Sequence, residues 1–325
     1  MPQGDSRAAS HRVTTYLIRR VLAIIPVLFG ISVLVFLLVH LIPGDVAQIL
    51  LGTQATDQQL ETLRRTFGLD RPLPIQYVDW LSHILRGDFG VSFRTNRAVL
   101  PDLVARFGVT LQLTLTSMVI AIAVAIPLGV ASAQNRGRTS DAVSRVIALL
   151  GLSIPNFWLG TLLILFVSLG LHWLPPVGFV SLLDNPWLGL QTLLLPAIAL
   201  GTAVAAFIMR MVRSSLLEVL RQDYIRTAYA KGLRDQSVLY RHALKNAFIP
   251  VLTVIGVQIG YLLGGAVIIE SIFSLPGMGR FMLDSISNRD YSIVQGGVLF
   301  IALVFCVVNL SVDLVYAWLD PRIRY

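Results

Sequence analysis

The amino-acid sequence predicts an all-α polytopic membrane protein with six transmembrane helices. Of its 325 residues, 55% are hydrophobic and only 14% are charged, whereas soluble domains carry about a quarter charged residues. Apolar runs of around 20 residues recur along the chain, and a helix of that length crosses a bilayer. Composition and run length together exclude an ordinary soluble domain.

The six predicted spans follow these apolar runs in chain order. The first run is longer than the apolar core of a cleaved signal peptide, so we interpret it as a retained span. Membrane helices tolerate proline where neighbours satisfy the freed carbonyl group, and five prolines lie in or beside the spans: Pro26, Pro127, Pro155, Pro196 and Pro250. The spans cover residues 21–42, 109–133, 146–170, 191–212, 248–269 and 294–318.

The distribution of basic residues predicts the orientation of the chain. With both termini in the cytoplasm, the inner segments hold 17 Arg and Lys against seven acidic residues, and the outer segments hold nine against 11. The inner loop 210–247 alone carries eight basic residues, among them both lysines of the chain, Lys231 and Lys245. Because basic loops remain on the cytoplasmic side, we expect an N-in/C-in topology.

The outer segment 43–108 is predicted to form a small helical extracytoplasmic insertion. Thr56 and Gln59 have the spacing of a helix capping box, and Gly68 is placed to end that helix. A second helix is expected from Pro74 to Arg86, because apolar residues recur there on one helical face: Ile75, Val78, Leu81 and Leu85.

Motifs for catalysis and for nucleotide binding are missing from the sequence. It contains no G-x-x-x-x-G-K-S/T phosphate-binding loop, no H-E-x-x-H and no G-x-S-x-G. Cys306, the single cysteine, lies in an apolar run, and we interpret it as a packing residue. We therefore expect no catalytic residue, no metal site and no cofactor in this chain, and an intramembrane enzyme is disfavoured because no paired catalytic groups are visible.

Charged residues near the middle of the spans are nearly absent. Arg210, Glu270 and Asp313 all lie towards span ends. Proton-driven carriers usually hold a charged residue near the membrane midplane. The pattern therefore argues against a stand-alone secondary transporter.

The fifth span carries glycines at every fourth position, Gly256, Gly260 and Gly264. This spacing gives a smooth helix face that permits close helix packing. Packing within the chain is one interpretation, and a subunit interface or pathway wall is the other.

The basic loop before the fifth span has the features of a protein-docking element. A short helix is expected from Asp223 to Ala230, and the small residues Ala228 and Gly232 would let a partner approach the backbone. Residues 237–246 carry apolar side chains at helical spacing, as in helices that bind a partner's groove. The alternative is a solvated loop that only sets topology or that is attracted to anionic lipid, and chemistry alone leaves the two evenly matched.

The same loop resembles the conserved cytoplasmic motif of ABC importer permeases, a glutamate-alanine-alanine triplet followed by a glycine. Arg226, Thr227 and Ala228 stand at the triplet positions and Gly232 at the glycine. The departure at the first two positions matches D-Y-x-R-T-A-x-A-K-G-L, the form of the dipeptide/oligopeptide branch. Further matches to this branch occur in order along nearly the whole chain: His40–Asp45, Phe67–Pro72, Gly87–Ser92, Phe273–Gly279, Arg289–Tyr291 and Asp320–Arg322.

The resemblance implies the type I permease fold of ABC importers and a corresponding division of the chain. A five-helix permease core at 109–318 would contain a cytoplasmic coupling loop at 213–247. The remaining parts would be a cytoplasmic segment at 1–20, a first transmembrane helix at 21–42, an extracytoplasmic segment at 43–108 and a cytoplasmic tail at 319–325.

The resemblance also implies partners and site residues. The chain would form half of a translocation pathway in a bacterial or archaeal plasma membrane, and a homologous second permease would form the other half. Two ATP-binding subunits would hold ATP and Mg, and an extracytoplasmic binding protein would also bind. No nucleic acid partner is expected. The outer gate or docking candidates are Phe273, Pro276, Gly277 and Gly279. The ATPase-coupling candidates are Asp223, Tyr224, Arg226, Thr227, Ala228, Lys231 and Gly232.

Di- and oligopeptides are the expected cargo, because they are the commonest cargo of this branch. Glutathione and nickel complexes remain alternatives within the same importer class. A stand-alone secondary transporter is the remaining alternative outside that class.

Overall fold

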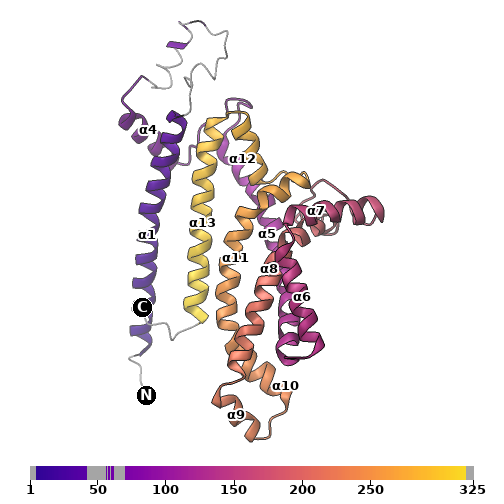
Figure 1. The fold of residues 1–325 in the computed structure, drawn as a ribbon. Coiled ribbons are helices and arrows are strands. Elements are labelled where there is room, and N and C mark those ends of the chain that lie inside the picture. The colour runs from indigo at the N-terminus through magenta and orange to yellow at the C-terminus, as the bar shows by residue number, and fades with distance from the viewer. Residues whose placement is uncertain (1–4, 42–55, 57, 59, 62–69, 320–325) are drawn as a thin grey trace. The chain divides into compact units, whose positions relative to one another are not determined.

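A computed structural model describes residues 5–41, 56, 58, 60, 61 and 70–319 (Figure 1). Their regular structure is helical, apart from an isolated β-bridge between Val91 and Ala98. The chain divides into two compact units, Met1–Arg106 with Phe281–Val307 and Phe107–Arg280 with Val308–Tyr325. Each unit is described separately.

The helices follow the apolar runs of the sequence and are labelled in Figure 1. In chain order they are α1 (Asp5–Leu41), α4 (Leu73–Leu85), α5 (Val99–Gln134), α6 (Thr139–Ser153), α7 (Asn156–Leu163), the π-helix η1 (Ile164–Gly170), α8 (Pro186–Val219), α9 (Asp223–Ala230), α10 (Asp235–Ser237), the π-helix η2 (Val238–Ala243), α11 (Leu244–Ile272), α12 (Met278–Ser287) and α13 (Tyr291–Leu319).

Five of the six predicted spans correspond to continuous helical segments that are long and apolar enough to cross a membrane. The third predicted span, residues 146–170, is not one continuous helix. The segments Thr139–Ser153 and Asn156–Gly170 are bent by 99° at the break between them, so within the described residues the sixth span exists only if this bent pair counts as one.

The break follows from Pro155. Its ring fixes the backbone at φ −62° and it has no amide hydrogen to donate to the preceding turn. The residue before a proline avoids the helical conformation, and Ile154 is extended at φ −81° and ψ 121°. The other four prolines noted in the sequence lie inside helices: Pro26, Pro127, Pro196 and Pro250.

In the first unit, α1 and α4 meet through aromatic side chains. Phe36 of α1 lies 5.4 Å from the ring centre of Tyr77 and 5.9 Å from that of Trp80, both on α4. The hydroxyl groups of Ser32 and Tyr77 are 2.8 Å apart and form a hydrogen bond. The helix predicted from Pro74 to Arg86 is confirmed as α4.

The apolar face predicted for α4 is largely left uncovered by this chain. Ile75, Val78 and Leu85 are 51%, 64% and 79% exposed. The neighbouring capping-box prediction lies partly outside the described residues, because Gln59 and Gly68 are not among them.

The segment after α4 owes its shape to glycine. Gly87 and Gly90 have φ values of +83° and +78°, a region that favours glycine because it lacks a Cβ atom. Asp88 lies between these two glycines. Its carboxylate accepts a hydrogen bond from the Gly90 amide and forms a second one with the His83 ring, and these bonds hold the pKa of Asp88 below its usual range. Ser92 then donates a 2.5 Å hydrogen bond to the buried carboxylate of Asp290, just before α13.

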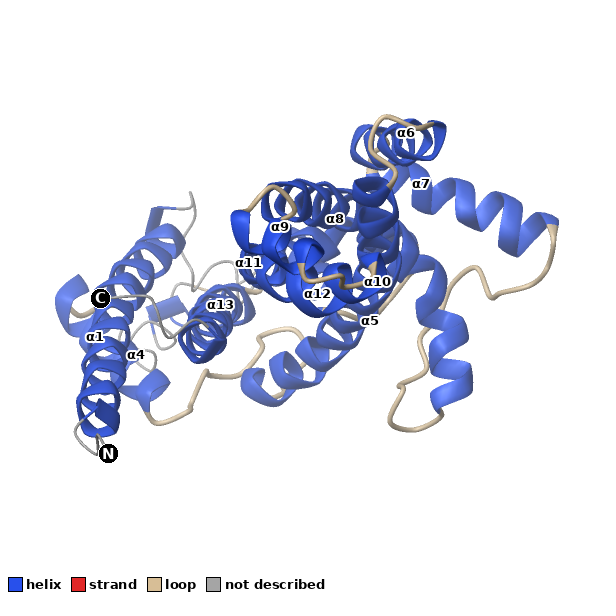
Figure 2. Cartoon of the chain, turned by 90° about the horizontal axis from the view of Figure 1, so that it is seen from below, coloured by secondary structure: helices blue, strands red, loops and turns tan. Residues whose placement is uncertain are grey.

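The second unit is built around α8, which contacts α6, α7 and α11 (Figure 2). Leu193, Leu200 and Ile208 of α8 are fully buried in the main apolar core. Gly201 permits the close approach of α5, since a Cβ atom there would lie 2.8 Å from the Ser117 carbonyl oxygen. Small residues therefore bring these helices together, as is common in membrane proteins.

Glu270, at the outer end of α11, is fully buried and links three elements. Its carboxylate accepts hydrogen bonds from the Thr110 hydroxyl at 2.5 Å and from the Arg280 amide at 3.0 Å. The Met278 amide donates to the Thr110 hydroxyl at 2.8 Å. The carboxylate and the hydroxyl thus satisfy free amides at the start of α12, where a negative charge also interacts favourably with the helix dipole.

We predict that Glu270→Ala lowers the thermal unfolding temperature of the purified protein by several degrees. The change leaves the Thr110 hydroxyl and an amide of α12 buried without their acceptor, at about 1–3 kcal/mol for each group. Tryptophan fluorescence during heating measures the shift. Asp184→Ala, which removes an exposed carboxylate, serves as the control, and equal stability of both variants would contradict this account.

Candidate coupling site

The predicted coupling loop, residues 213–247, begins within the last two turns of α8. Helix α8 continues to Val219, and a short turn leads into α9. The helix predicted from Asp223 to Ala230 is confirmed with those limits. Asp223 lies in the first turn, where a carboxylate is stabilised by the positive end of the helix dipole.

The inner face of α9 packs against the chain itself. Ile225 and Ala228 are only 1% and 7% exposed, and they join the same core as Val238, Leu239 and Ala243 of η2. The expectation that Ala228 lets a partner approach the backbone is therefore wrong. The apolar residues predicted to enter a partner's groove instead bury α9 against its own chain.

Gly232 shapes the end of α9. Its φ of +77° lies in the left-handed region. The Gly232 amide donates to the Tyr229 carbonyl at 2.9 Å, and the Leu233 amide donates to the Ala228 carbonyl at 3.3 Å. This pair of bonds is the Schellman motif that commonly ends helices at a glycine. A Cβ atom at Gly232 would meet nothing within 4 Å in this chain, so the backbone conformation is what requires glycine here.

The outer face of α9 carries aromatic and charged side chains. Tyr224 and Tyr229 are 42% and 45% exposed. Arg226 pairs with Asp223 at 3.3 Å, and both side chains are well exposed. Thr227 donates to the Asp223 carbonyl at 3.0 Å. Lys231 follows as an exposed residue at the end of the helix.

A hydrogen bond joins this face to the base of α11. The Asn246 side chain donates to the Tyr224 hydroxyl at 2.9 Å. Both residues line a cavity of about 530 Å³ between the end of α8 and the start of α11, together with Ser215, Glu218 and Gln222.

An ion pair that the sequence analysis missed fixes the helix that leads into α9. Asp141 of α6 is 1% exposed, and Arg213 of α8 reaches both of its oxygens, at 2.9 and 3.0 Å. Ser132 donates to the same carboxylate at 2.7 Å and the Gly137 amide donates at 3.1 Å. The pair therefore binds the inner ends of α5, α6 and α8 together.

One signal for this pair was present in the sequence. Asp141 is the only acidic residue in the inner segment 134–145, which also holds three arginines. Its partner lies 72 residues away, so the pairing itself had no local signature.

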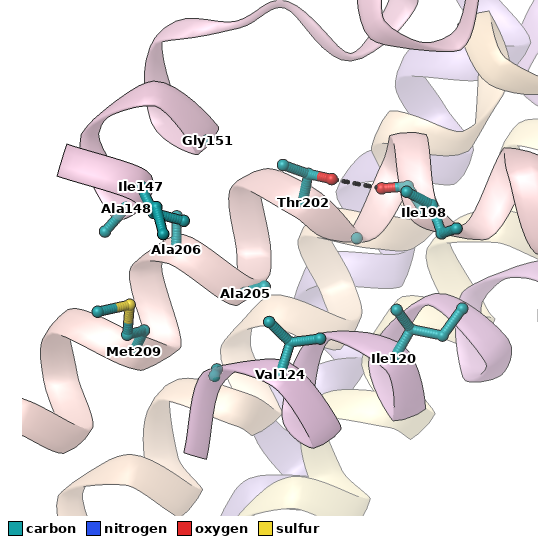
Figure 3. Close-up of a pocket in the computed structure, with 12 residues that line it drawn as sticks. Ile120, Val124, Ile147, Ala148, Gly151, Ile198, Thr202, Ala205, Ala206 and Met209 are labelled. Carbon is teal, nitrogen blue, oxygen red and sulfur yellow. Dashed lines mark hydrogen bonds between the residues drawn. The ribbon is translucent and has the colours of Figure 1, made fainter. Parts of the chain in front are cut away.

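An apolar groove lies between α5, α6 and α8 (Figure 3). Its volume is about 320 Å³, and Ile120, Val124, Ile147 and Met209 are among its lining residues. The Thr202 hydroxyl in its wall donates to the Ile198 carbonyl at 2.6 Å (Figure 3). The groove therefore offers mainly apolar contacts to a ligand. Elsewhere, among the described residues, no group of three His, Cys, Asp or Glu side chains could hold a metal ion.

The three glycines of the fifth span differ in their surroundings. A Cβ atom at Gly256 would overlap the Val312 side chain of α13, and Gly260 is buried. Gly264 faces open space, with nothing within 4 Å of a Cβ atom there. Close packing within the chain thus accounts for Gly256, while the role of Gly264 stays a prediction.

The four outer-gate candidates lie in and beside the turn that Glu270 organises. Phe273 is 1% exposed, and a Cβ atom at Gly160 would lie 3.1 Å from its ring. A Cβ atom at Gly277 would overlap the Glu270 carboxylate, and one at Gly279 would overlap Val267. Pro276 is half-buried beside them. Packing explains Phe273 and both glycines, and a gating or docking role remains a prediction.

We predict that Asp141→Ala destabilises the protein more than the double variant Asp141→Leu/Arg213→Met. The single change leaves the guanidinium of Arg213 largely buried without its carboxylate, and breaking a buried pair costs about 3–5 kcal/mol. Thermal unfolding and membrane yield measure the effect. Asp223→Ala removes a well-exposed carboxylate and should change little. A double variant as unstable as the single one would contradict the prediction.

Comparison with known proteins identifies the family. Residues 125–325 match the family model described as "Binding-protein-dependent transport system inner membrane component", and residues 13–114 match the model of its N-terminal part. The chain is 43% identical to the dipeptide transport system permease protein of Alkalihalophilus pseudofirmus, and 45% identical to the glutathione transport system permease protein of Escherichia coli. Each comparison covers 95% of this chain and 99% of the relative. The chain therefore belongs to the binding-protein-dependent inner membrane components and is a permease subunit of an ABC importer.

Proposed function

We propose that this permease forms half of the translocation pathway of an ATP-driven importer for di- and oligopeptides. The relatives that match over nearly the full length are named as dipeptide and glutathione permeases. Glutathione is itself a small peptide, so the two names agree on peptide-like cargo. Glutathione is the second candidate, since its named permeases are as similar to this chain as the dipeptide permease.

We propose that α9 couples this chain to an ATP-binding subunit. The observation that carries this proposal is the division of α9 into two faces. Ile225 and Ala228 hold the inner face in the core, while Tyr224, Arg226 and Tyr229 remain exposed on the other face. Tyr and Arg are enriched among the residues that dominate protein–protein binding energy.

The proposed assembly supplies what the chain itself lacks. No phosphate-binding loop occurs in the sequence, so ATP and Mg would be bound by two partner subunits. A homologous second permease would provide the other half of the pathway. An extracytoplasmic binding protein would deliver the cargo, as the family description implies.

We assign the outer segments a docking or gating role. Residues 43–108 and 270–292 are expected on the outer side. The buried Glu270 network makes the turn at 273–279 a firm element. The half-buried Pro276 would then lie at the outer surface that meets the binding protein, and the buried Phe273, Gly277 and Gly279 would support that surface from within.

Reconstitution tests the proposal. The tagged chain is purified with its partners, placed in proteoliposomes, and assayed for ATP hydrolysis with a dipeptide, an oligopeptide or glutathione in the presence of the binding protein. We expect co-purification of a second permease and ATP-binding subunits, with hydrolysis and uptake stimulated most by peptides. Stimulation by glutathione alone would select the second candidate. Uptake without any ATP-binding subunit would contradict the importer assignment.

Substitution of Gly232 separates two explanations for this glycine. Asn adopts the left-handed conformation far more readily than a β-branched residue. We therefore predict that Gly232→Asn retains most peptide-stimulated ATP hydrolysis, whereas Gly232→Val lowers it several-fold. The amount of co-purified ATP-binding subunit is measured in parallel. Equal loss in both variants would show that a close-fitting partner, and not the backbone conformation, requires glycine here.

A further inference from the structure

A second groove, distinct from the apolar one in Figure 3, lies between residues 145–152 of α6 and residues 207–214 of α8. These two helices pack side by side (Figure 1). The groove has a volume of about 530 Å³. Its wall combines arginines with exposed or half-buried apolar side chains: Arg145, Arg210, Leu149, Leu152 and Phe207.

The charge in this groove is not balanced by the chain. Arg213 also reaches the groove, but both oxygens of Asp141 already bind it. Arg145 lies 3.7 Å from the same carboxylate, and its side chain is 59% exposed. Arg210 is exposed and forms no ion pair within the described part of the chain. The guanidinium groups of Arg145 and Arg210 therefore face the groove, and the nearby Asp141 carboxylate is already bound by Arg213. This excess of positive charge favours an anionic ligand.

The depth of Arg210 matches the boundary of the bilayer. The 24 residues from Pro186 to Met209 carry no charge, and as a helix they are about 36 Å long. The hydrocarbon core is about 30 Å thick. Arg210 is thus the first charged residue of α8 and, in the N-in orientation, lies at the level of the inner headgroups.

The apolar residues lie on the bilayer side of the arginines. In the N-in orientation α6 runs outward from the cytoplasmic side, so Leu149 and Leu152 lie deeper in the membrane than Arg145. Helix α8 runs inward, so Phe207 lies deeper than Arg210. Leu149 is 62% exposed and Phe207 is 46% exposed. Cations at the headgroup level with an apolar wall directly above them match the two parts of a phospholipid.

We propose that this groove binds an anionic phospholipid of the inner leaflet. Its phosphate contacts Arg145 and Arg210, and one acyl chain lies along Leu149, Leu152 and Phe207. Basic pockets between transmembrane helices on the cytoplasmic side are a known type of site for anionic headgroups. The proposal goes beyond the transport function and depends on the N-in orientation, not on the identity of the cargo.

The test compares lipids retained by the purified importer complex. Native mass spectrometry measures binding of palmitoyl-oleoyl phosphatidylglycerol, with phosphatidylcholine and glycerol 3-phosphate as comparison ligands. The variants are Arg145→Gln/Arg210→Gln and the charge-preserving Arg145→Lys/Arg210→Lys. The matched control is Arg136→Gln/Arg138→Gln, which removes two exposed arginines of the same inner segment that do not line the groove.

We expect the wild-type complex to prefer phosphatidylglycerol, and the glutamine variant at 145 and 210 to lose roughly 5-fold affinity per arginine. The lysine variant should retain most binding, and the control should resemble wild type. Equal losses in the glutamine variant and the control would overturn the proposal, because they indicate general charge attraction. Equal binding of glycerol 3-phosphate would overturn it in favour of a free anion site. Absence of lipid from the wild-type complex would overturn it in favour of a groove covered by a partner subunit.

Discussion

A buried charge and a free helix end both need hydrogen-bond partners, and the second unit meets this constraint with two carboxylates. Asp141 binds Arg213, Ser132 and the Gly137 amide near the inner ends of α5, α6 and α8. Glu270 binds Thr110 and the Arg280 amide near the outer end of α11. Each acid is buried, and each is placed where helix ends converge. The apolar interior between them then needs only close packing, which Gly201 and Gly256 permit.

The sequence predicted the features that depend on local pattern. Apolar run length located the spans, because a helix must cover the hydrocarbon core with uncharged residues. Residues 223–230 were recognised as a helix, and α4 followed from its periodicity. Pro155 was noted, but the 99° bend there could not be predicted, because a proline inside an apolar run is also compatible with a continuous helix, as Pro127 and Pro196 show.

Contacts between residues far apart in the sequence could not be predicted from local patterns. Arg213 lies 72 residues from Asp141, and Thr110 lies 160 residues from Glu270, so no spacing rule connects these pairs. The coupling candidates show that the conformation and burial of single residues were also not predictable from the sequence. Gly232 was noticed, but its role follows from a φ of +77°. Ala228 was expected to be accessible, and only the fold reveals that it is buried in the same core as residues of η2. The gating and coupling roles themselves depend on partners and remain proposals.

The contacts that attach α9 to the rest of the chain have a consequence for the proposed coupling. Two buried side chains, the bond from Asn246 to Tyr224 and the glycine turn attach this short helix to the chain at several points. These attachments join α9 to the ends of α8 and α11. In the proposed coupling role, a displacement of the exposed face of α9 by an ATP-binding subunit would therefore move the two long helices that hold it.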